Sequence, residues 1–311
     1  MPEKNLITLC ILTYNRNESV SLLVTDLVEK EVNKIANILI IDDGSEDETF
    51  IKLKEFRTQK NISLLRNEEN QGFANTFIRC LREAPTEYLA ICTDDEIITH
   101  EGLLELHDLI RSSAPDFIST KFKSRYAGRG HSKTALLNFP DIWNAARHIP
   151  GLIFKKSSSL SLVEMVQDKL DSKNAIAFFF PQIYLLLLMQ ASEMKLFKST
   201  IVISAKNTKG SQPSQLINSS GQSYAGLSTV IERFTAFTEI YLSLIEDPNY
   251  HKAHPEIRLL LKKHERSFFK IVESAIYFEN PDLLRVFRKS LFLRIFNFKL
   301  TYRTLKEKLK F

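Results

Sequence analysis

The sequence has little cysteine and no long uninterrupted apolar run. Its three cysteines, Cys10, Cys80 and Cys92, form no C-x-x-C pair and no cluster with histidine, so neither a disulfide framework nor a zinc site is indicated. The longest apolar run, residues 175–189, is interrupted by a proline and a glutamine, whereas a helix that spans a bilayer needs about 20 apolar residues. We therefore expect buried thiols in a reducing compartment and no membrane-spanning segment.

Positive charge is also scarce outside one segment. Of the 42 Lys and Arg, nine lie in residues 285–311 with a single acid, which leaves 33 basic against 36 acidic residues in the rest of the chain. A uniformly basic surface is therefore absent, and we expect no nucleic-acid partner. The first residues also lack the charged-then-apolar layout of a signal peptide, so the expected location is cytoplasmic.

Apolar runs alternate with helical patterns in the first 122 residues. Each run reads as a buried parallel strand, and the segments between them place apolar residues at helical spacing. This alternation predicts an α/β fold with a mainly parallel sheet flanked by helices. The expected strands are Leu6–Leu12, Asn37–Ile41, Ile62–Arg66 and Tyr88–Thr93. One of the helices between them is expected at about Glu46–Arg57, with Ser45 as its N-cap.

A polar cluster follows each expected strand: Thr13–Asn15, Asp42–Asp43, Asn70–Gly72 and Asp94–Glu96. Ligands of open α/β sheets bind at the carboxyl ends of the strands, so these clusters are expected to converge at one edge. The last cluster places three carboxylates in a row, which repel one another unless a cation lies between them. Hard carboxylate oxygens suit Mn²⁺ or Mg²⁺, and such ions also bridge to phosphate oxygens.

With these four motifs in order and in register, residues 5–122 resemble the nucleotide-sugar-binding half of family 2 glycosyltransferases, which have the GT-A (Rossmann-like) fold. The motifs that carry the resemblance are Leu12-Thr13-Tyr14-Asn15-Arg16, Ile41-Asp42-Asp43-Gly44-Ser45, Asn70-Gln71-Gly72-Phe73-Ala74-Asn75 and Thr93-Asp94-Asp95-Glu96. The resemblance implies that residues 1–122 bind a nucleotide-diphospho-sugar donor. Helical patterns in residues 224–311 also predict a helical C-terminal region beside the α/β fold.

The resemblance assigns donor-binding roles to individual residues. The Tyr14 ring matches the position that lies against the nucleotide base, and Asp43 matches the carboxylate that accepts a hydrogen bond from the base, usually uracil. Asn70 and Gly72 match the loop that closes over the base and the ribose. Three further residues, Thr13, Asn15 and Asp42, are expected in the same donor site, although Asp42 is alternatively a residue that orients the turn.

The acidic motif matches the metal-binding motif of the family. Here it contains two consecutive aspartates, and we expect Asp95 to bind the metal and Asp94 to contact the ribose. Glu96 is expected as a direct ligand or as a partner of one. The implied cofactor is Mn²⁺ or Mg²⁺.

Residues 123–223 are expected to form the acceptor-binding half, with a mobile loop at Lys206–Ser223. A buried helix is expected at Ala175–Ser192, with Pro181 near its start. The segment 151–156 looks like the family segment that shapes the acceptor side. Family members commonly carry a Glu-Asp pair before a later helix, but the corresponding stretch, Phe178–Ile183, contains no acid. The catalytic base is therefore left open. Its candidates by position in the sequence are His148, Glu164, Asp168 and Asp171.

Residues 224–311 are expected to be helical and to end in a basic amphipathic tail at 285–311. Aromatic and aliphatic residues alternate with lysines and arginines in this tail, which fits a helix at an anionic membrane surface. A terminal helix packed on its own domain fits the same pattern, and both hypotheses stay open. The first would place the protein on the inner face of the membrane.

The expected function is metal-assisted transfer of a sugar from a nucleotide-diphosphate donor to a hydroxyl group. The resemblance implies that the transfer is a direct displacement with inversion. A UDP-sugar is the favoured donor, and a glycan or lipid-linked molecule of surface polysaccharide synthesis is the expected acceptor. A nucleotidyltransferase is one alternative, although no Gly-rich phosphate loop with lysine lies near the N-terminus. A catalytically inactive nucleotide-sugar-binding protein is the other, because the expected acid pair is missing.

Overall fold

The computed structural model describes residues 5–94, 96–123, 134–146, 149–206 and 227–279. The chain divides into two compact units, one of Met1–Ser214 with Ile240–Leu260 and one of Gln215–Glu239 with Leu261–Phe311. Within the described ranges, no helix is both long enough and apolar enough to cross a bilayer. The expected mobile loop, apart from Lys206, and the basic tail lie outside these ranges.

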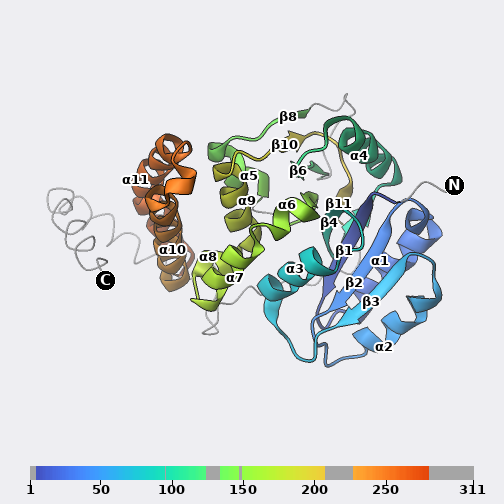
Figure 1. The fold of residues 1–311 in the computed structure, drawn as a ribbon. Helices are drawn as coiled ribbons and strands as arrows, with labels where there is room; N and C mark the ends of the chain where they lie inside the picture. Colours follow the sequence, from blue (N-terminus) through green and yellow to red (C-terminus); the bar gives the residue numbers. More distant parts are fainter. Residues whose placement is uncertain (1–4, 95, 124–133, 147–148, 207–226, 280–311) are drawn as a thin grey trace. The chain divides into compact units, whose positions relative to one another are not determined.

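The first unit is built on an eight-stranded sheet with the order β3-β2-β1-β4-β9-β6-β10-β8 (Figure 1). Strands β3, β2, β1 and β4 are parallel neighbours, whereas β9 runs antiparallel to both β4 and β6. Strand β10 is parallel to β6, and β8 is antiparallel to β10 at the edge. The bounds are β1 Ile7–Thr13, β2 Asn37–Asp42, β3 Ile62–Arg66, β4 Tyr88–Thr93, β6 Phe117–Ser119, β8 Thr134–Leu136, β9 Leu152–Lys155 and β10 Leu196–Ser199.

A second, three-stranded sheet has the order β5-β11-β7, with β5 at Glu96–Ile98, β11 at Ser204–Lys206 and β7 at Phe122–Lys123. Strand β5 follows directly after the end of β4. The mainly parallel sheet flanked by helices confirms the fold class predicted from the sequence.

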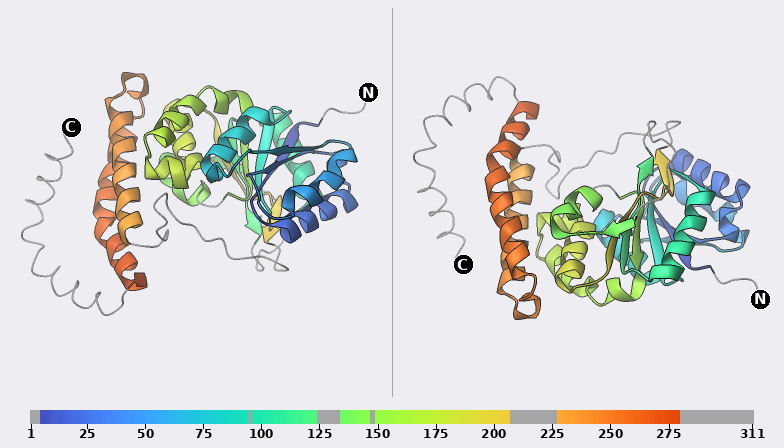
Figure 2. Two further views of the ribbon diagram at one scale, coloured as in Figure 1. Left: turned by 90° about the horizontal axis from the view of Figure 1, so that it is seen from below. Right: turned by 90° about the horizontal axis from the view of Figure 1, so that it is seen from above.

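Helices cover both faces of the large sheet because both faces of its central strands are apolar. Leu9 of β1 lies in one core with Leu23 of α1 and Leu106 of α4 (His100–Ser113). The next residue, Cys10, lies outside that core and faces the opposite side of the sheet, near Cys80 of α3. Figures 1 and 2 accordingly show α1 (Asn17–Glu29) and α3 (Gly72–Glu83) on opposite sides of the strands. Each buried aliphatic side chain contributes about 1.5–3 kcal/mol relative to exposure, so this arrangement fixes the register of the central strands.

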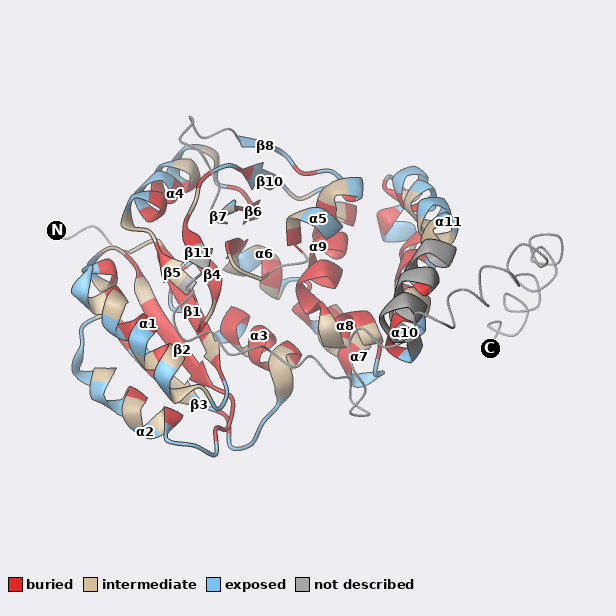
Figure 3. Cartoon of the chain, turned by 180° about the vertical axis from the view of Figure 1, so that it is seen from behind, coloured by how far each residue is buried: buried red, intermediate tan, exposed pale blue. Residues whose placement is uncertain are grey.

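The central strands are buried along most of their length, as Figure 3 shows for β1, β2 and β4. On the α3 side, Phe77 packs edge-on against Phe154 of β9 at a centroid distance of 5.6 Å, and Phe154 also contacts Phe117 of β6 at 5.0 Å. All three thiols are buried and free, as predicted. The aromatic contacts join the parallel half of the sheet to its antiparallel half.

The remaining helices of the first half are α2 Thr49–Leu53 and α4 His100–Ser113. The second half adds α5 Ile142–Ala146, α6 Lys156–Leu160, α7 Val163–Asp171, α8 Ala175–Phe179 and α9 Pro181–Ala191. The C-terminal helices are α10 Leu227–Glu246 and α11 His254–Glu279. Short 3₁₀ turns lie at Val32–Lys34, Lys54–Thr58, Phe139–Asp141 and Pro248–Tyr250. The C-terminal part of the described chain is thus helical, as expected.

Several boundaries differ from the sequence-based expectation. The single helix expected at Ala175–Ser192 is two helices that break at Phe180, whose φ of −140° is not helical. Proline restricts the residue before it to extended conformations, so Pro181 begins a new helix and does not continue the old one. The helix expected from Glu46 to Arg57 begins only at Thr49 and changes to a 3₁₀ turn at Lys54.

The second unit contains an aromatic pair between its two helical segments. Phe234 stacks on His264 at a centroid distance of 4.0 Å and an interplanar angle of 12°. Nε2 of His264 lies 3.0 Å from the carbonyl oxygen of Phe234. Burial lowers the pKa of His264, although the hydrogen bond with the Phe234 carbonyl opposes this shift.

Candidate functional site

The carboxyl ends of β1, β2 and β4 lie side by side. The register places Thr13 beside Asp42 on one flank of β1 and Leu12 beside Thr93 on the other. The backbone N–H of Asp43 continues this pairing beyond the strand by donating to the Thr13 carbonyl oxygen at 2.9 Å. The strand-end clusters therefore share one edge of the sheet, and the rest of the site is built from the loops that leave it.

Asp94 is tied to the end of β1. The Thr13 hydroxyl donates to Oδ2 of Asp94 at 3.2 Å, and Nε of Arg16 lies 3.7 Å from the same oxygen. Asp94 is buried, so the positive guanidinium offsets part of the cost of placing its carboxylate there. Arg16 belongs to the first strand-end motif, but nothing in the sequence pattern predicts that its partner is Asp94, 78 positions away.

Asn15 joins the loop after β1 to the loop after β2. Its φ is +51°, a left-handed conformation that asparagine tolerates better than most residues. The backbone N–H of Asn15 donates to the Ser45 hydroxyl at 2.9 Å, and its side-chain oxygen accepts from the N–H of Glu46 at 2.8 Å. The expected role of Ser45 as a helix cap is therefore wrong, because α2 begins at Thr49 and has no side-chain cap. Tyr14, the residue before Asn15 in the same loop, is 37% exposed.

Asp42 is fully buried at the end of β2. Its Oδ2 accepts from the N–H of Ser45 at 3.2 Å and lies 3.3 Å from Nε of Arg66. Its Oδ1 is buried without a hydrogen-bond partner among the described residues. Burial raises the pKa of Asp42, although the contacts with Ser45 and Arg66 oppose this shift. These contacts place Asp42 in the turn itself.

Asp43, in contrast, faces the loop after β3. Its Oδ1 accepts two hydrogen bonds, from Nδ2 of Asn67 at 2.5 Å and from the backbone N–H of Gln71 at 2.9 Å. Asn67 was not among the residues that the sequence singled out. Asn67 precedes the Asn70–Gly72 cluster. A polar residue in a loop does not show in the sequence which distant residue it contacts, and Asp43 lies 24 positions away.

The loop after β3 crosses closely over Gly44. A side-chain Cβ on Gly44 would lie 2.5 Å from the carbonyl carbon of Glu69, and the φ of +74° also favours glycine here. The same loop turns at Gly72, whose N–H donates to Oδ1 of Asn70 at 2.9 Å and whose φ is +77°. Glycine is thus favoured at both positions by the positive φ of the backbone, and at Gly44 also by the close approach of the neighbouring loop.

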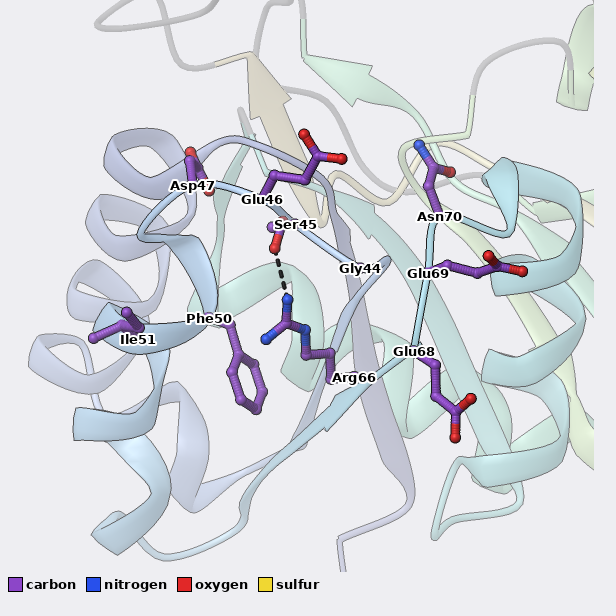
Figure 4. Close-up of a pocket in the computed structure, with 10 residues that line it drawn as sticks. All are labelled: Gly44, Ser45, Glu46, Asp47, Phe50, Ile51, Arg66, Glu68, Glu69 and Asn70. Atoms are coloured by element: carbon purple, nitrogen blue, oxygen red, sulfur yellow. Dashed lines mark hydrogen bonds between the residues drawn. The ribbon is translucent and has the colours of Figure 1, made fainter.

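A pocket of about 390 Å³ lies between these two loops and α2 (Figure 4). Nη2 of Arg66 donates to the carbonyl oxygen of Ser45 at 2.7 Å, and its guanidinium lies over the Phe50 ring at 4.8 Å. The other lining residues are Gly44, Glu46, Asp47, Ile51, Glu68, Glu69 and Asn70. Four carboxylates against one arginine disfavour a diphosphate in this pocket, and Thr13, Asp43 and Asp94 do not line it. The strand ends are therefore a better candidate for the donor site than this pocket.

The candidate bases on α7 have partners away from the strand ends. Glu164 is exposed and pairs with Arg82 of α3 at 2.8 Å, and Asp171 accepts from Gln167 at 2.9 Å. Asp168 lines a separate pocket of about 190 Å³ with Tyr184. His148 lies outside the described residues.

In that separate pocket, burial raises the pKa of Tyr184 to about 12, and the neighbouring Tyr250 and Asp168 act in the same direction. The acid-free stretch Phe178–Ile183 runs into the start of α9 and contains Gln182, which is 1% exposed. Its Nε2 donates to the Ala146 carbonyl oxygen at 3.2 Å, while its Oε1 has no partner among the described residues. None of these contacts includes a residue of the strand-end site.

The proposed metal ligands are only partly described. Asp95 lies outside the described residues, and of Glu96 only its backbone in β5 is described. Among the residues that the structure describes, no three His, Cys, Asp or Glu side chains are grouped as a metal site. Asp94, their described neighbour, sits at the turn between β4 and β5.

The chain matches the family described as glycosyl transferase family 2 over residues 8–161. It is 22% identical to the cholesterol galactosyltransferase of Borreliella burgdorferi over 135 residues, which make up 43% of this chain and 37% of that protein. The alignment thus spans little more than a third of that relative's length.

Two solved structures have similar folds. S. aureus TarS 1-349 has a TM-score of 0.58 and 15% identity over 87% of this chain and 74% of that chain, and it is also known in complex with UDP-GlcNAc. The mannosyltransferase PcManGT from Pyrobaculum calidifontis, in complex with GDP-Man and Mn²⁺, has a TM-score of 0.53 and 13% identity over 98% of this chain and 85% of that chain.

The mainly parallel sheet with helices on both faces and polar loops at the strand ends matches the GT-A fold of glycosyltransferases. The match over residues 8–161 covers the four strand-end motifs and the segment at 151–156. The chain belongs to glycosyl transferase family 2 and is a glycosyl transferase enzyme, which confirms the family and the enzyme class predicted from its sequence.

Proposed function

We propose that this enzyme transfers a sugar from a UDP-sugar to a hydroxyl group of a glycan or of a lipid-linked acceptor in surface polysaccharide synthesis. The observation that carries the proposal is the ordered strand-end edge, where Thr13, Asp43 and Asp94 are each fixed by hydrogen bonds to another loop or strand. The fold likeness to TarS, which is known in complex with UDP-GlcNAc, supports a UDP-sugar. By its family, the transfer proceeds by direct displacement with inversion.

The donor base is proposed to lie against the Tyr14 ring, which is 37% exposed and thus accessible to a ligand. Asp43 accepts a hydrogen bond from the base, and the Asn70–Gly72 loop closes over the base and ribose. Stacking of a base on an aromatic ring contributes about 1–3 kcal/mol where it has been measured by alanine substitution. Asp94, oriented by Thr13 and Arg16, is proposed to bind the ribose hydroxyls.

The proposed metal ligand is Asp95, with Glu96 as a second ligand or as its partner, and the metal is Mn²⁺ or Mg²⁺. Carboxylate oxygens are the donors that these hard cations prefer, so the donor set fits the ion. When bound, the metal neutralises negative charge on the departing nucleoside diphosphate. The presence of Mn²⁺ in the PcManGT complex supports this choice.

The acceptor hydroxyl must lose a proton to a base. His148, Glu164, Asp168 and Asp171 remain the proposed candidates. The stretch Phe178–Ile183, which corresponds to the one where family members commonly carry an acid pair, contains no acid, and its Gln182 cannot take up a proton. That observation favours one alternative function, a nucleotide-sugar-binding protein that does not turn over.

Two measurements test the proposal together. A thermal-shift screen of nucleotide sugars with Mn²⁺ should show a higher melting temperature with a UDP-sugar, because a ligand of the native state stabilises it. Release of UDP should then require an acceptor glycan or lipid-linked sugar. Binding without any release supports the inactive alternative, whereas pyrophosphate release from UTP and a sugar phosphate supports a nucleotidyltransferase.

We also propose that residues 285–311 bring the enzyme to an anionic membrane surface, where a lipid-linked acceptor would be found. Each Lys or Arg near such a surface contributes about 1 kcal/mol. Flotation with anionic and neutral liposomes tests this role. The proposal requires binding to the anionic vesicles that is lost when residues 285–311 are deleted, and unchanged flotation of the truncated chain contradicts it.

A further inference from the structure

The Asp43 carboxylate is held in one orientation by the loop after β3. Oδ1 accepts a hydrogen bond from Nδ2 of Asn67 at 2.5 Å and another from the backbone N–H of Gln71 at 2.9 Å. Asp43 is 6% exposed, and its backbone N–H is bonded to the Thr13 carbonyl oxygen. The side chain therefore has little freedom to rotate, and its two oxygens have different surroundings.

Asn67 is fixed just as firmly as Asp43. Its Nδ2 donates both to Asp43 and to the Thr76 hydroxyl, at 3.0 Å for the latter. Its Oδ1 accepts from the guanidinium of Arg79, which can only donate. The amide thus cannot be flipped without placing its NH₂ group against Arg79. Its backbone N–H is also bonded, to the Asp42 carbonyl oxygen at 2.8 Å.

This arrangement leaves Asp43 with one open acceptor atom. A carboxylate oxygen has two lone pairs, and both lone pairs of Oδ1 are already used by Asn67 and Gln71. Oδ2 has no hydrogen-bond partner in the part of the chain that the structure describes. Asp43 can therefore accept from a ligand through a single oxygen.

Nucleotide bases differ in the donors that they present at their pairing edge. Uracil and thymine present one ring N–H, which one oxygen satisfies. Guanine presents a ring N–H beside an amino N–H, and a carboxylate satisfies both only by using both oxygens. With Oδ1 filled, guanine would bury a donor without a partner, which costs more than the bond is worth.

We propose that Asn67 determines base specificity: by filling Oδ1 of Asp43, it makes the site select a uracil or thymine nucleotide over a guanine nucleotide. This inference rests on the proposed function, in which Asp43 meets the donor base. It distinguishes this chain from a GDP-sugar enzyme by a residue outside the four strand-end motifs. Asn67 acts through Asp43 and does not itself contact the base.

The test is isothermal titration of the full-length chain with UDP, dTDP and GDP in the presence of Mn²⁺. The wild type should bind UDP and dTDP at least about tenfold more tightly than GDP, the effect expected of about one hydrogen bond. Asn67→Ala should reduce this ratio several-fold, because it frees a lone pair on Oδ1. General damage to the site would weaken all three nucleotides and leave the ratio unchanged, so the ratio is the informative quantity.

Asn75→Ala is the matched control. Nδ2 of Asn75 donates to the Gln71 carbonyl oxygen at 2.9 Å, so this variant perturbs the same loop without touching Asp43, and it should keep the wild-type ratio. If Asn67→Ala does not fold, Arg79→Lys removes the guanidinium that orients the amide and should also lower the ratio. An unchanged ratio in a folded Asn67 variant overturns the inference alone. Tighter binding of GDP by the wild type overturns the inference together with the proposed UDP-sugar donor. Absence of binding by all three nucleotides overturns the proposed function with it.

Discussion

The Thr13 hydroxyl donates a hydrogen bond to Oδ2 of Asp94 at 3.2 Å, across 81 positions of sequence. This bond joins the end of β1 to the end of β4, two parallel neighbours in the sheet. It gives the first and the last strand-end motif a common geometry, because the orientation of Asp94 depends on a residue of the first motif.

Thr13→Val removes this hydrogen bond and keeps the shape of the side chain. We expect a loss of about 1 kcal/mol of unfolding free energy and an approximately tenfold weaker affinity for the donor nucleotide, because Asp94 loses its orientation. Urea denaturation and nucleotide titration measure the two effects.

Thr8→Val is its matched control. Thr8 lies at the other end of β1, where its hydroxyl is buried 2.6 Å from that of Thr86. This variant should lose a similar stability but keep wild-type donor affinity. Equal losses of affinity in both variants would show that the strand-end bond has no special part in binding.

Gly44→Ala and Gly72→Ala separate backbone strain from close packing. Both residues have positive φ, +74° and +77°, but a Cβ on Gly44 would lie 2.5 Å from the Glu69 carbonyl carbon, whereas a Cβ on Gly72 would meet nothing within 4 Å. We expect a loss of about 1 kcal/mol for Gly72→Ala and about 3 kcal/mol or more for Gly44→Ala in urea denaturation. Similar losses in the two variants would contradict the close loop approach.

The buried Asp42 predicts a pH dependence of stability. Burial raises its pKa above the ordinary value of 3.8, so the folded state holds this proton more tightly than the unfolded state does. The stability that the protonated group contributes is present below that value and is lost as the pH rises through the folded pKa. Asp42→Asn removes the titration, so its stability relative to the wild type should increase as the pH rises above 3.8.

Asp47→Asn provides the comparison for this measurement. Burial acts to raise the pKa of Asp47, but hydrogen bonds with Thr49 and Asn17 outweigh it and lower the pKa below 3.8. The stability that the ionised Asp47 contributes is present above its unfolded-state pKa and is lost as the pH falls through its folded-state pKa. Asp47→Asn should therefore be less stable than the wild type at neutral pH, and this difference should disappear in acid. If the difference in unfolding free energy between Asp42→Asn and the wild type did not change with pH, that result would contradict a raised pKa of Asp42 in the folded state.

Much of the fold follows from local sequence patterns. Continuous apolar runs predicted β1 to β4, and the alternation with helices predicted a mainly parallel sheet with its polar strand ends on one edge. The break at Phe180 was missed because the apolar pattern continues through Pro181. The role of Ser45 was predicted wrongly because a cap pattern and an inter-loop acceptor use the same residue type.

The partners of the strand-end carboxylates could not be predicted in the same way. Arg16 with Asp94 and Asn67 with Asp43 are tertiary pairs, and they depend on how neighbouring loops cross. Arg79, which orients Asn67, lies on α3 and has the spacing of an ordinary solvent-facing helix residue. Sequence patterns identify strand ends, but they do not show which oxygen of a carboxylate is already occupied.

Asp95→Ala tests the proposed metal ligand. It should abolish metal-dependent binding of the donor, and EDTA should have the same effect on the wild type. The variant should still fold, with equal or greater stability without metal, because it removes one of three adjacent like charges. Asp108→Ala, an exposed carboxylate on α4, should change neither quantity. Metal-dependent binding that survives in Asp95→Ala would remove this residue from the site.

Release of UDP from a UDP-sugar, measured in the presence of Mn²⁺ and an acceptor glycan, is the direct test of sugar transfer by this enzyme. The wild type should release UDP only with an acceptor, and EDTA should abolish the release. Asp43→Ala and Asp95→Ala should reduce it at least about a hundredfold, the effect of losing about 3 kcal/mol of binding or transition-state stabilisation. Full turnover by Asp95→Ala, or binding of the nucleotide sugar that never leads to UDP release with any acceptor, would contradict the proposed function.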